Sequence, residues 1–168
     1  AADGSVKKAM KQSPAPFMHK RNARKIATGN LDDDLGMLAD CDWVVEVIIE
    51  NLEIKQGLYA RLEEVLGDQV ILTSNTSTIP LALLTAKMGD ALKTRFAITH
   101  FFNPPRYMRL LELVKGPETK PAVIDQLRDF CDRVLGKGVV ECKDSPAFIA
   151  NRIGQFWTGM SMRAAFDQ

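Results

Sequence analysis

The sequence predicts an α/β fold: an open, mostly parallel sheet with helices on both faces. Short apolar segments rich in β-branched residues alternate along the chain with amphipathic segments of helical period. The segment Trp43–Ile49 is apolar without regular alternation, as expected of a strand that is covered on both faces. Strands separated by single helices pair in parallel through right-handed crossovers, which places the sheet between two helical layers.

The individual elements follow from apolar spacing and from glycine and proline stops. Strands are expected at residues 43–49, 70–73, 96–99, 110–114 and 139–142. Helices are expected at residues 31–38, 53–66, 80–89 and 123–135, and Gly67 and Gly136 end two of them. The basic stretch Lys7–Arg24 indicates two short helices separated by prolines, or alternatively a solvated helical face.

A change of pattern near Ser145 divides the chain. We expect residues 1–144 to form the sheet domain and residues 145–168 to form the first helix of an all-α C-terminal domain. Pro146 stands at the expected helix start, and a mixed apolar stretch runs from there to Phe166.

Composition and charge favour small-molecule chemistry. The 22 basic and 21 acidic residues give a net charge of +1 and are mixed along the chain, so neither nucleic acid nor a membrane is expected as a partner. Cys41, Cys131 and Cys142 show no metal-ligand or disulfide spacing. We interpret all three as buried thiols, and we expect no metal site and a cytoplasmic, reducing location.

Polar side chains follow three of the predicted strands. They are Glu50-Asn51, the run Ser74-Asn75-Thr76-Ser77, and His100 with the residues through Pro105. Ligands of open parallel sheets bind beyond the carboxyl ends of the strands, so these side chains are candidates for a binding or catalytic site.

His100 and Glu112 are the leading candidates for acid–base chemistry. A histidine exchanges protons near neutral pH, although a lone histidine after a strand is more often structural. Glu112 stands twelve residues later in an otherwise apolar segment, where an ionised side chain requires a partner. If the intervening Pro-Pro turn folds the chain back, Glu112 can accept from one ring nitrogen of His100 and leave the other as a base. The alternative is an edge-strand glutamate that faces water.

Other polar residues could have a purely structural role instead of a role in binding or catalysis. Ser77 and Asn75 could donate to a substrate oxygen, or they could cap the helix expected near Ile79. Asn151, on spacing alone, is a helix-surface residue.

Three signatures of the chain together resemble the L-3-hydroxyacyl-CoA dehydrogenase family. They are Asn75-Thr76-Ser77, then His100-Phe101-Phe102-Asn103-Pro104 with Glu112 following, and then the segment from Lys143-Asp144-Ser145-Pro146 to Asn151-Arg152. They occur in order and the similarity covers nearly the whole chain. The resemblance implies an incomplete Rossmann-like sheet, and it implies reversible oxidation of an L-3-hydroxyacyl-CoA by NAD in fatty-acid β-oxidation.

The resemblance also implies roles for individual residues. His100 would be the general base, Glu112 its orienting carboxylate, and Ser77 the partner of the substrate's 3-oxygen. Asn151 would help to hold the reacting groups. NAD contacts would involve Glu50, Lys55, Ser77 and Asn103, although Glu50 could instead be a cap and Lys55 a solvated helix lysine. CoA phosphates would meet Lys8, Lys11, Lys20 and Arg21, and the full-length parent would be a homodimer.

The sequence departs from the family pattern at two places. The chain contains no Gly-x-Gly-x-x-Gly loop, whose glycines let a backbone approach the NAD pyrophosphate, and Gly136-Lys137-Gly138 precedes a strand instead of following one. We therefore expect a fragment that has no NAD turnover alone. Ala147 stands where the family usually has glycine, a difference expected to change a helix start only slightly. Pro105-Arg106-Tyr107-Met108 resembles the versions in enzymes fused to an enoyl-CoA hydratase.

Two other functions are compatible with the residues. One is a nucleotide-domain remnant that binds or assembles without catalysis, against which the retention of all four candidate catalytic residues argues. The other is a 3-hydroxy-acid dehydrogenase of related fold, and such enzymes usually use a lysine base.

Overall fold

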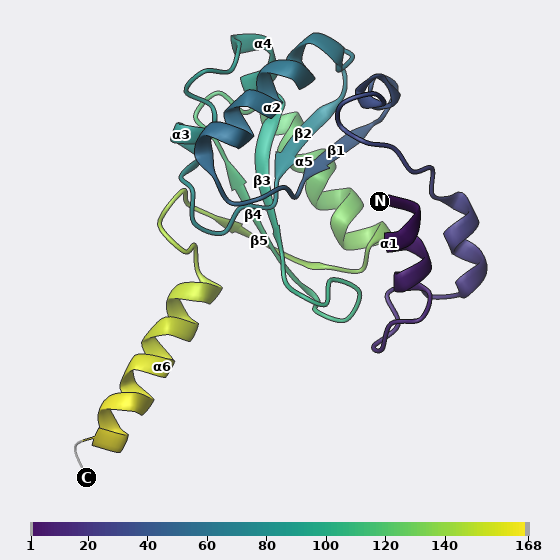
Figure 1. Ribbon diagram of the computed structural model, residues 1–168. Coiled ribbons are helices and arrows are strands. Elements are labelled where there is room, and N and C mark those ends of the chain that lie inside the picture. Colours follow the sequence, from purple (N-terminus) through teal and green to yellow (C-terminus); the bar gives the residue numbers. More distant parts are fainter. Residues whose placement is uncertain (1, 167–168) are drawn as a thin grey trace.

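The computed structural model describes residues 2–166 and places a five-stranded sheet at the centre of the molecule (Figure 1). The strands are β1 (Trp43–Glu46), β2 (Ile71–Ser74), β3 (Phe96–Phe101), β4 (Leu110–Lys115) and β5 (Gly138–Cys142). The longer α-helices are α1 (Ala2–Ala9), α2 (Leu52–Val65), α5 (Pro121–Asp129) and α6 (Ala150–Phe166). Short helical segments are η1 (Lys20–Lys25), η2 (Leu35–Leu38), α3 (Leu81–Leu84), α4 (Asp90–Lys93) and η3 (Phe130–Val134).

The strands lie in the order in which they occur in the chain, β1 to β5. β1, β2 and β3 are parallel, and β4 and β5 are parallel to each other, but β3 and β4 are antiparallel neighbours. The reason is the connection: residues 102–109 hold no helix and turn the chain back at Pro104-Pro105, whereas a parallel crossover requires a longer connection. The expected open, mostly parallel sheet is confirmed, with one reversal inside it.

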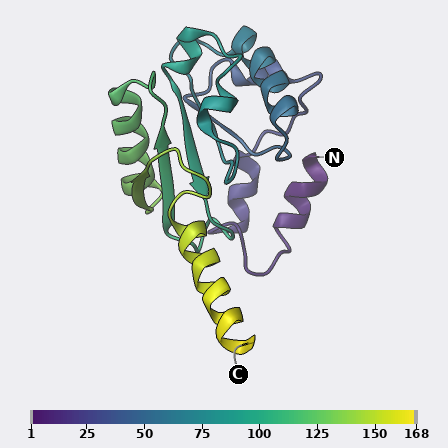
Figure 2. The ribbon, with the colours of Figure 1, turned by 90° about the vertical axis from the view of Figure 1, so that its left-hand side faces the viewer.

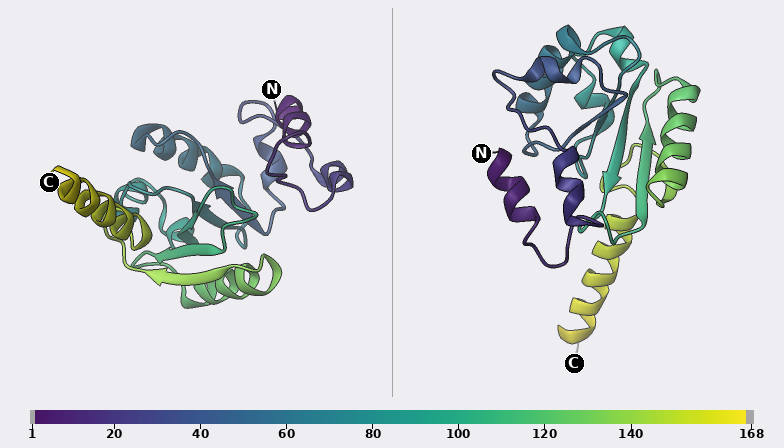
Figure 3. Two further views of the ribbon diagram at one scale, coloured as in Figure 1. Left: turned by 90° about the horizontal axis from the view of Figure 1, so that it is seen from below. Right: turned by 90° about the vertical axis from the view of Figure 1, so that its right-hand side faces the viewer.

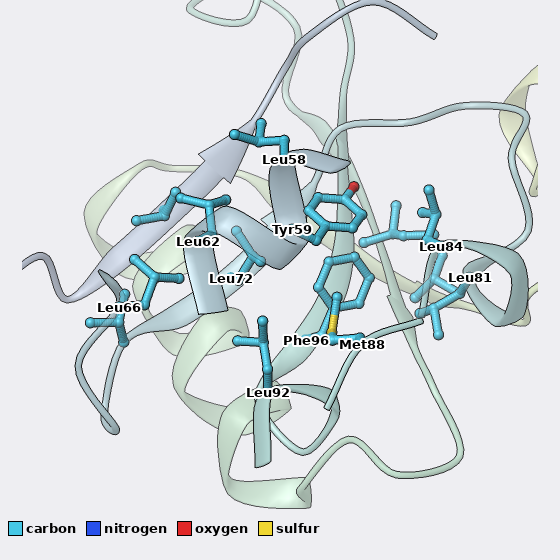
Figure 4. Close-up of a cluster of buried hydrophobic side chains, with 14 of the residues drawn as sticks. Leu58, Tyr59, Leu62, Leu66, Leu72, Leu81, Leu84, Met88, Leu92 and Phe96 are labelled. Carbon is cyan, nitrogen blue, oxygen red and sulfur yellow. The ribbon is translucent and has the colours of Figure 1, made fainter. Parts of the chain in front are cut away.

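One face of the sheet is covered by α2, α3 and α4. The side chains of Val44, Leu72, Phe96, Ile98 and Val114 point to this face and are buried there against Leu58, Tyr59, Leu62, Leu81, Leu84 and Leu92 from the three helices. Figure 4 shows the Tyr59 ring beside that of Phe96, at a centroid separation of 5.5 Å. Burial of this much apolar surface is the main stabilising contribution to the domain.

The opposite face is covered by α5, so the sheet lies between helices as predicted (Figures 2 and 3). Val123, Ile124 and Leu127 of α5 pack on Ile71, Ala97 and Leu113 of the sheet. The spacing of these three helix residues places them on one stripe.

Several expected elements differ from those observed. The helix expected at residues 80–89 is two short helices, α3 and α4, and the helix expected at residues 123–135 ends as a π-turn, η3. The strand expected to reach Ile49 ends at Glu46, and Val47 and Ile49 are exposed. The expected 31–38 helix is only the short η2.

The C-terminal segment extends away from the sheet (Figure 1). Residues 146–149 form a turn, and α6 then runs from Ala150 to Phe166 with no buried residue. The expected domain boundary at residue 144 stays a prediction. No helix within residues 2–166 combines the length and apolar character needed to cross a membrane.

Candidate active site

His100 and Glu112 lie directly opposite each other on β3 and β4. Because cross-strand partners project to the same face, their side chains meet, and His100 Nδ1 lies 2.8 Å from Glu112 Oε2. The His100 side chain is 8% exposed and that of Glu112 is 1% exposed. The side-chain contact expected from the sequence is therefore present, and it leaves Nε2 as the imidazole nitrogen available to another group.

The second oxygen of Glu112 is bonded to the start of α6. Oε1 accepts the backbone N–H groups of Ile149 at 2.9 Å and Ala150 at 2.8 Å. Since β4 lies between β3 and β5 and Glu112 is buried, the alternative of an edge-strand glutamate facing water is wrong. A buried carboxylate with donors on both oxygens is held in one orientation.

Aromatic rings enclose the imidazole. The Phe102 ring centroid lies 4.5 Å from that of His100, and the Phe148 centroid lies 5.8 Å away. Phe148, which is buried, belongs to the turn before α6, so residues separated by almost fifty positions pack around one imidazole.

The turn after β2 is organised by its own side chains. Asn75 Oδ1 accepts the Phe101 N–H at 2.9 Å, which joins the ends of β2 and β3. Thr76 Oγ1 accepts the Ile79 N–H at 3.1 Å. The register sets Ser74 beside Ile98, so Ser77, which follows β2, and His100, which lies near the end of β3, are at the same edge of the sheet.

The capping alternative for Ser77 and Asn75 is wrong, because the amides at the start of α3 have another partner. Asp144 accepts the N–H groups of Leu81 at 3.1 Å and Ala82 at 3.4 Å. Asp144 thereby attaches the segment before α6 to α3, a contact between residues more than sixty positions apart.

Glu50 contacts the turn that carries Ser77. Its Oε1 accepts the Ser77 N–H at 3.3 Å and the Thr78 hydroxyl at 2.9 Å, and it also accepts the Thr76 hydroxyl. Burial acts to raise the pKa of Glu50, but the Thr76 and Thr78 hydroxyls and the nearby Lys55 ammonium outweigh it, so the pKa lies below its ordinary value. Glu50 is therefore ionised at neutral pH. The helix cap belongs to its neighbour Asn51, whose side chain accepts the Ile54 N–H at 3.1 Å.

Lys55 is buried, so its interpretation as a solvated helix lysine is wrong. Its ammonium lies 2.7 Å from Glu46 Oε1 and 3.4 Å from Glu50 Oε2, and the side chain is 1% exposed. The first turn of α2 thus brings a cation to the carboxyl end of β1.

The two asparagines differ in their relation to the His100–Glu112 pair. Asn151 stands in the first turn of α6, directly after Ala150, whose amide binds Glu112. Asn103 lies exposed in the loop after β3. That loop is held by Lys137, whose ammonium donates to the carbonyls of Pro105 and Met108.

The basic residues near the N-terminus, Lys8, Lys11, Lys20 and Arg21, are exposed. Their segment is attached to the loop after β3 by Arg106, which donates to the carbonyls of Ala15 at 2.7 Å and Phe17 at 2.9 Å. Figure 1 shows this N-terminal part beside the main body of the molecule. Within residues 2–166 no group of three or more His, Cys, Asp or Glu side chains could hold a metal ion.

Sequence reasoning missed Glu46, Asp144 and Lys137. Glu46 carries the same signal as Glu112, a single acid inside an apolar strand, and could have been found by it. Asp144 and Lys137 gave no comparable signal, because their partners are backbone groups distant in sequence.

Comparison with known proteins identifies the family. The family model described as "3-hydroxyacyl-CoA dehydrogenase, NAD binding domain" matches residues 1–145. A putative fatty acid oxidation complex trifunctional enzyme of Rickettsia felis is 47% identical over 158 residues, which are 94% of this chain and 22% of that protein. A probable 3-hydroxyacyl-CoA dehydrogenase of Deinococcus radiodurans is 44% identical over 92% of this chain and 45% of its own length.

Solved structures agree with the sequence comparison. The 3-hydroxybutyryl-CoA dehydrogenase of Escherichia coli K12 superposes with a TM-score of 0.83 at 32% identity, covering 99% of this chain and 35% of that one. The chain spans less than half the length of each of these relatives. It belongs to the 3-hydroxyacyl-CoA dehydrogenase family, and the part of the family that it matches is the NAD-binding domain.

Proposed function

We propose that this chain supplies the general base for NAD-dependent oxidation of an L-3-hydroxyacyl-CoA to the 3-ketoacyl-CoA, as in fatty-acid β-oxidation. The observation that carries the proposal is the 2.8 Å contact between His100 Nδ1 and Glu112 Oε2 in a site where both side chains are buried. The family membership supports the reaction class, because relatives bear the name 3-hydroxyacyl-CoA dehydrogenase.

In this proposal, Nε2 of His100 removes the proton of the substrate's C3 hydroxyl as the C3 hydride departs. Glu112 fixes the imidazole tautomer, with the proton on Nδ1, and stabilises the imidazolium that forms. A base within hydrogen-bond reach accelerates such a step by a factor of ~10² to 10⁴. In the reverse direction the same imidazolium returns the proton to the 3-keto oxygen.

Ser77 and Asn151 are proposed to hold the reacting groups. Ser77 lies on a turn that is fixed by Glu50 and follows the strand next to that of His100. Asn151 is placed by the same N-terminus of α6 that binds Glu112. A donor that is held in position before the reaction stabilises developing charge on oxygen with little reorganisation.

NAD, when bound, accepts the hydride. The residues present fit its nicotinamide end: Glu50 keeps 38% of its side chain exposed at the carboxyl end of β1, where ligands of such sheets bind. Asn103 is exposed near the same edge, whereas Lys55 is enclosed and would act through Glu50. The pyrophosphate cradle is not among these 168 residues.

The whole protein's other properties are also proposals. The exposed Lys8, Lys11, Lys20 and Arg21 fit the phosphates of an acyl-CoA by charge. A homodimer is proposed through α6, which exposes Phe156 and Trp157. A cytoplasmic location is proposed because Cys41, Cys131 and Cys142 are free thiols.

The test is the reduction of acetoacetyl-CoA by NADH, measured for the full-length protein that carries this chain. His100→Gln is expected to lower kcat by a factor of ~10² to 10⁴. His19→Gln is the matched control, because His19 is the other histidine and lies exposed, where its Nδ1 accepts the Arg21 N–H at 3.1 Å. A kcat unchanged by His100→Gln would remove the proposed base, and binding of acyl-CoA without turnover would favour the non-catalytic alternative.

A lysine base, the alternative for a related 3-hydroxy-acid dehydrogenase, has little support. Two buried lysines lie near this edge of the sheet: Lys55, whose ammonium is paired with Glu46 and Glu50, and Lys137, whose ammonium donates to the Pro105 and Met108 carbonyls. Both amino groups are thus already occupied by acceptor atoms of the protein itself.

A further inference from the structure

A buried polar network joins β1, α2 and β2 next to the candidate dyad. Glu46 ends β1, and its side chain is 1% exposed. Oε1 accepts from the Ile48 N–H at 2.6 Å and the Lys55 ammonium at 2.7 Å. Oε2 accepts from the Tyr59 hydroxyl and the Ser74 hydroxyl, each at 2.7 Å. Both oxygens of the buried Glu46 carboxylate therefore accept two hydrogen bonds, and these bonds offset the cost of burying its charge.

Lys55 connects this network to the surface of the site. Its ammonium lies 2.7 Å from Glu46 and 3.4 Å from Glu50. The first carboxylate is enclosed and the second is 38% exposed. The contact with Glu46 is therefore both shorter and less accessible to water, so it is the stronger one and fixes the position of the Lys55 ammonium.

Glu50 in turn holds the turn that carries Ser77. One oxygen binds the amides of Ser77 at 3.3 Å and Thr78 at 3.4 Å, while the other faces Lys55. An unbroken series of polar contacts thus runs from Glu46 through Lys55 and Glu50 to the Ser77 amide.

We propose that Glu46 is a positioning residue for the Ser77 turn, acting through Lys55 and Glu50. The proposal rests on the proposed function, in which Ser77 binds the substrate oxygen. Glu46 touches no reacting group. It holds a cation, the cation holds the carboxylate of Glu50, and that carboxylate sets the backbone of residues 77 and 78. A glutamate that served only to fill the core would influence stability but not this turn.

The test is amide hydrogen exchange of Ser77 and Thr78, followed by NMR on this chain. Glu46→Gln keeps the shape of the side chain but removes the charge, and it is expected to accelerate exchange at both amides by about tenfold relative to wild type. The matched control is Glu63→Gln, which removes the same charge from α2, where Glu63 accepts the Gly89 N–H at 3.1 Å. The control is expected to leave the two turn amides unchanged.

A second variant separates a loss of positioning of the Ser77 turn from a general loss of stability. Glu46→Gln with Lys55→Met removes both charges of the buried pair, so no unpaired charge remains in the core. Wild-type exchange at Ser77 and Thr78 in this folded double variant would overturn the proposal.

Kinetics of the full-length protein separate the positioning role from the proposed function. Glu46→Gln is expected to lower kcat for acetoacetyl-CoA reduction by about tenfold, since small misplacements of a binding group are costly to the rate. If Ser77→Ala leaves kcat unchanged while Glu46→Gln accelerates exchange, the turn is positioned but the role of Ser77 is wrong. If Ser77→Ala lowers kcat while Glu46→Gln changes neither exchange nor kcat, the positioning role is wrong.

Discussion

Glu112 accepts the backbone N–H of Ala150 at 2.8 Å, so the carboxylate that contacts His100 also caps α6. The cap satisfies amides that have no partner within the helix, and the negative charge lies at the positive end of the helix dipole. The direction in which α6 leaves the sheet is thereby tied to the same side chain that orients the imidazole.

Glu112→Ala is expected to lower the free energy of unfolding by about 3 kcal/mol, because it leaves the imidazole and the Ile149 and Ala150 amides without their acceptor. Urea denaturation followed by circular dichroism measures this loss. Glu118→Ala is the control, since Glu118 is exposed. Equal losses in the two variants would contradict the structural role of Glu112.

Ala147→Gly is expected to stabilise the protein by about 0.5–1 kcal/mol. Ala147 has a φ of 62°, in the left-handed region that strains an L-residue with a side chain, and glycine relieves this strain. The gain exceeds the entropy that glycine adds to the unfolded chain. The position lies in the turn before α6 rather than at the helix start, so the expectation of a minor helix-start effect needs correction.

Thermal unfolding of Ala147→Gly should be compared with that of Ala60→Gly. Ala60 lies exposed in the interior of α2, where glycine is expected to cost about 1 kcal/mol. Destabilisation by both substitutions would show that the turn is not strained.

Gly116→Ala is expected to lower the free energy of unfolding by about 1–3 kcal/mol. A Cβ at this position would lie 2.7 Å from Leu81 Cδ2, and Leu81 is buried in the core. Gly57→Ala is the control, because its Cβ would meet nothing within 4 Å and alanine favours the interior of α2. Chemical denaturation of the two variants should therefore give opposite signs, and matching signs would rule out a close contact at Gly116.

Cys131 and Cys142 are expected to resist alkylation at pH 8. Burial raises the pKa of Cys131 to about 11, and burial together with the adjacent Glu112 raises the pKa of Cys142 to about 11. The thiolate fraction is then about 100-fold below that of an ordinary thiol, and the thiolate is the reactive form. Cys41 is only partly buried, contrary to its interpretation as a buried thiol, and mass spectrometry should find it modified first. In urea all three should react alike.

The same two thiols make stability depend on alkaline pH. Their folded pKa values lie above the ordinary thiol value of 9.0, so the folded state favours the protonated form. This contribution is fully present below pH 9.0 and is lost as the pH rises through about 11. The free energy of unfolding should fall over that interval, and it should fall less in Cys131→Ala; an equal fall would exclude Cys131 as a cause.

The strands were predictable from sequence because each is a compact apolar run between turn residues. The division of the expected 80–89 helix into α3 and α4 was not predictable, since the apolar spacing continues past Thr85, the C-cap of α3. The His100–Glu112 contact was predictable because a charged residue in an apolar strand requires a partner.

The burial of Lys55 and its pairing with Glu46 could not be predicted from the sequence. Helical spacing places a residue on one face of a helix, but it does not tell whether a long side chain turns into the sheet. The Asp144 contact with α3 joins residues distant in sequence and depends on the finished fold.

The antiparallel hairpin of β3 and β4 makes the His100–Glu112 contact a short-range one, between residues 12 positions apart. Contacts between residues close in sequence cost little loop-closure entropy and form early in folding. The spacing between imidazole and carboxylate is thus set within one local hairpin, whereas the orientation of the carboxylate also depends on the C-terminal segment, through the Ile149 and Ala150 amides.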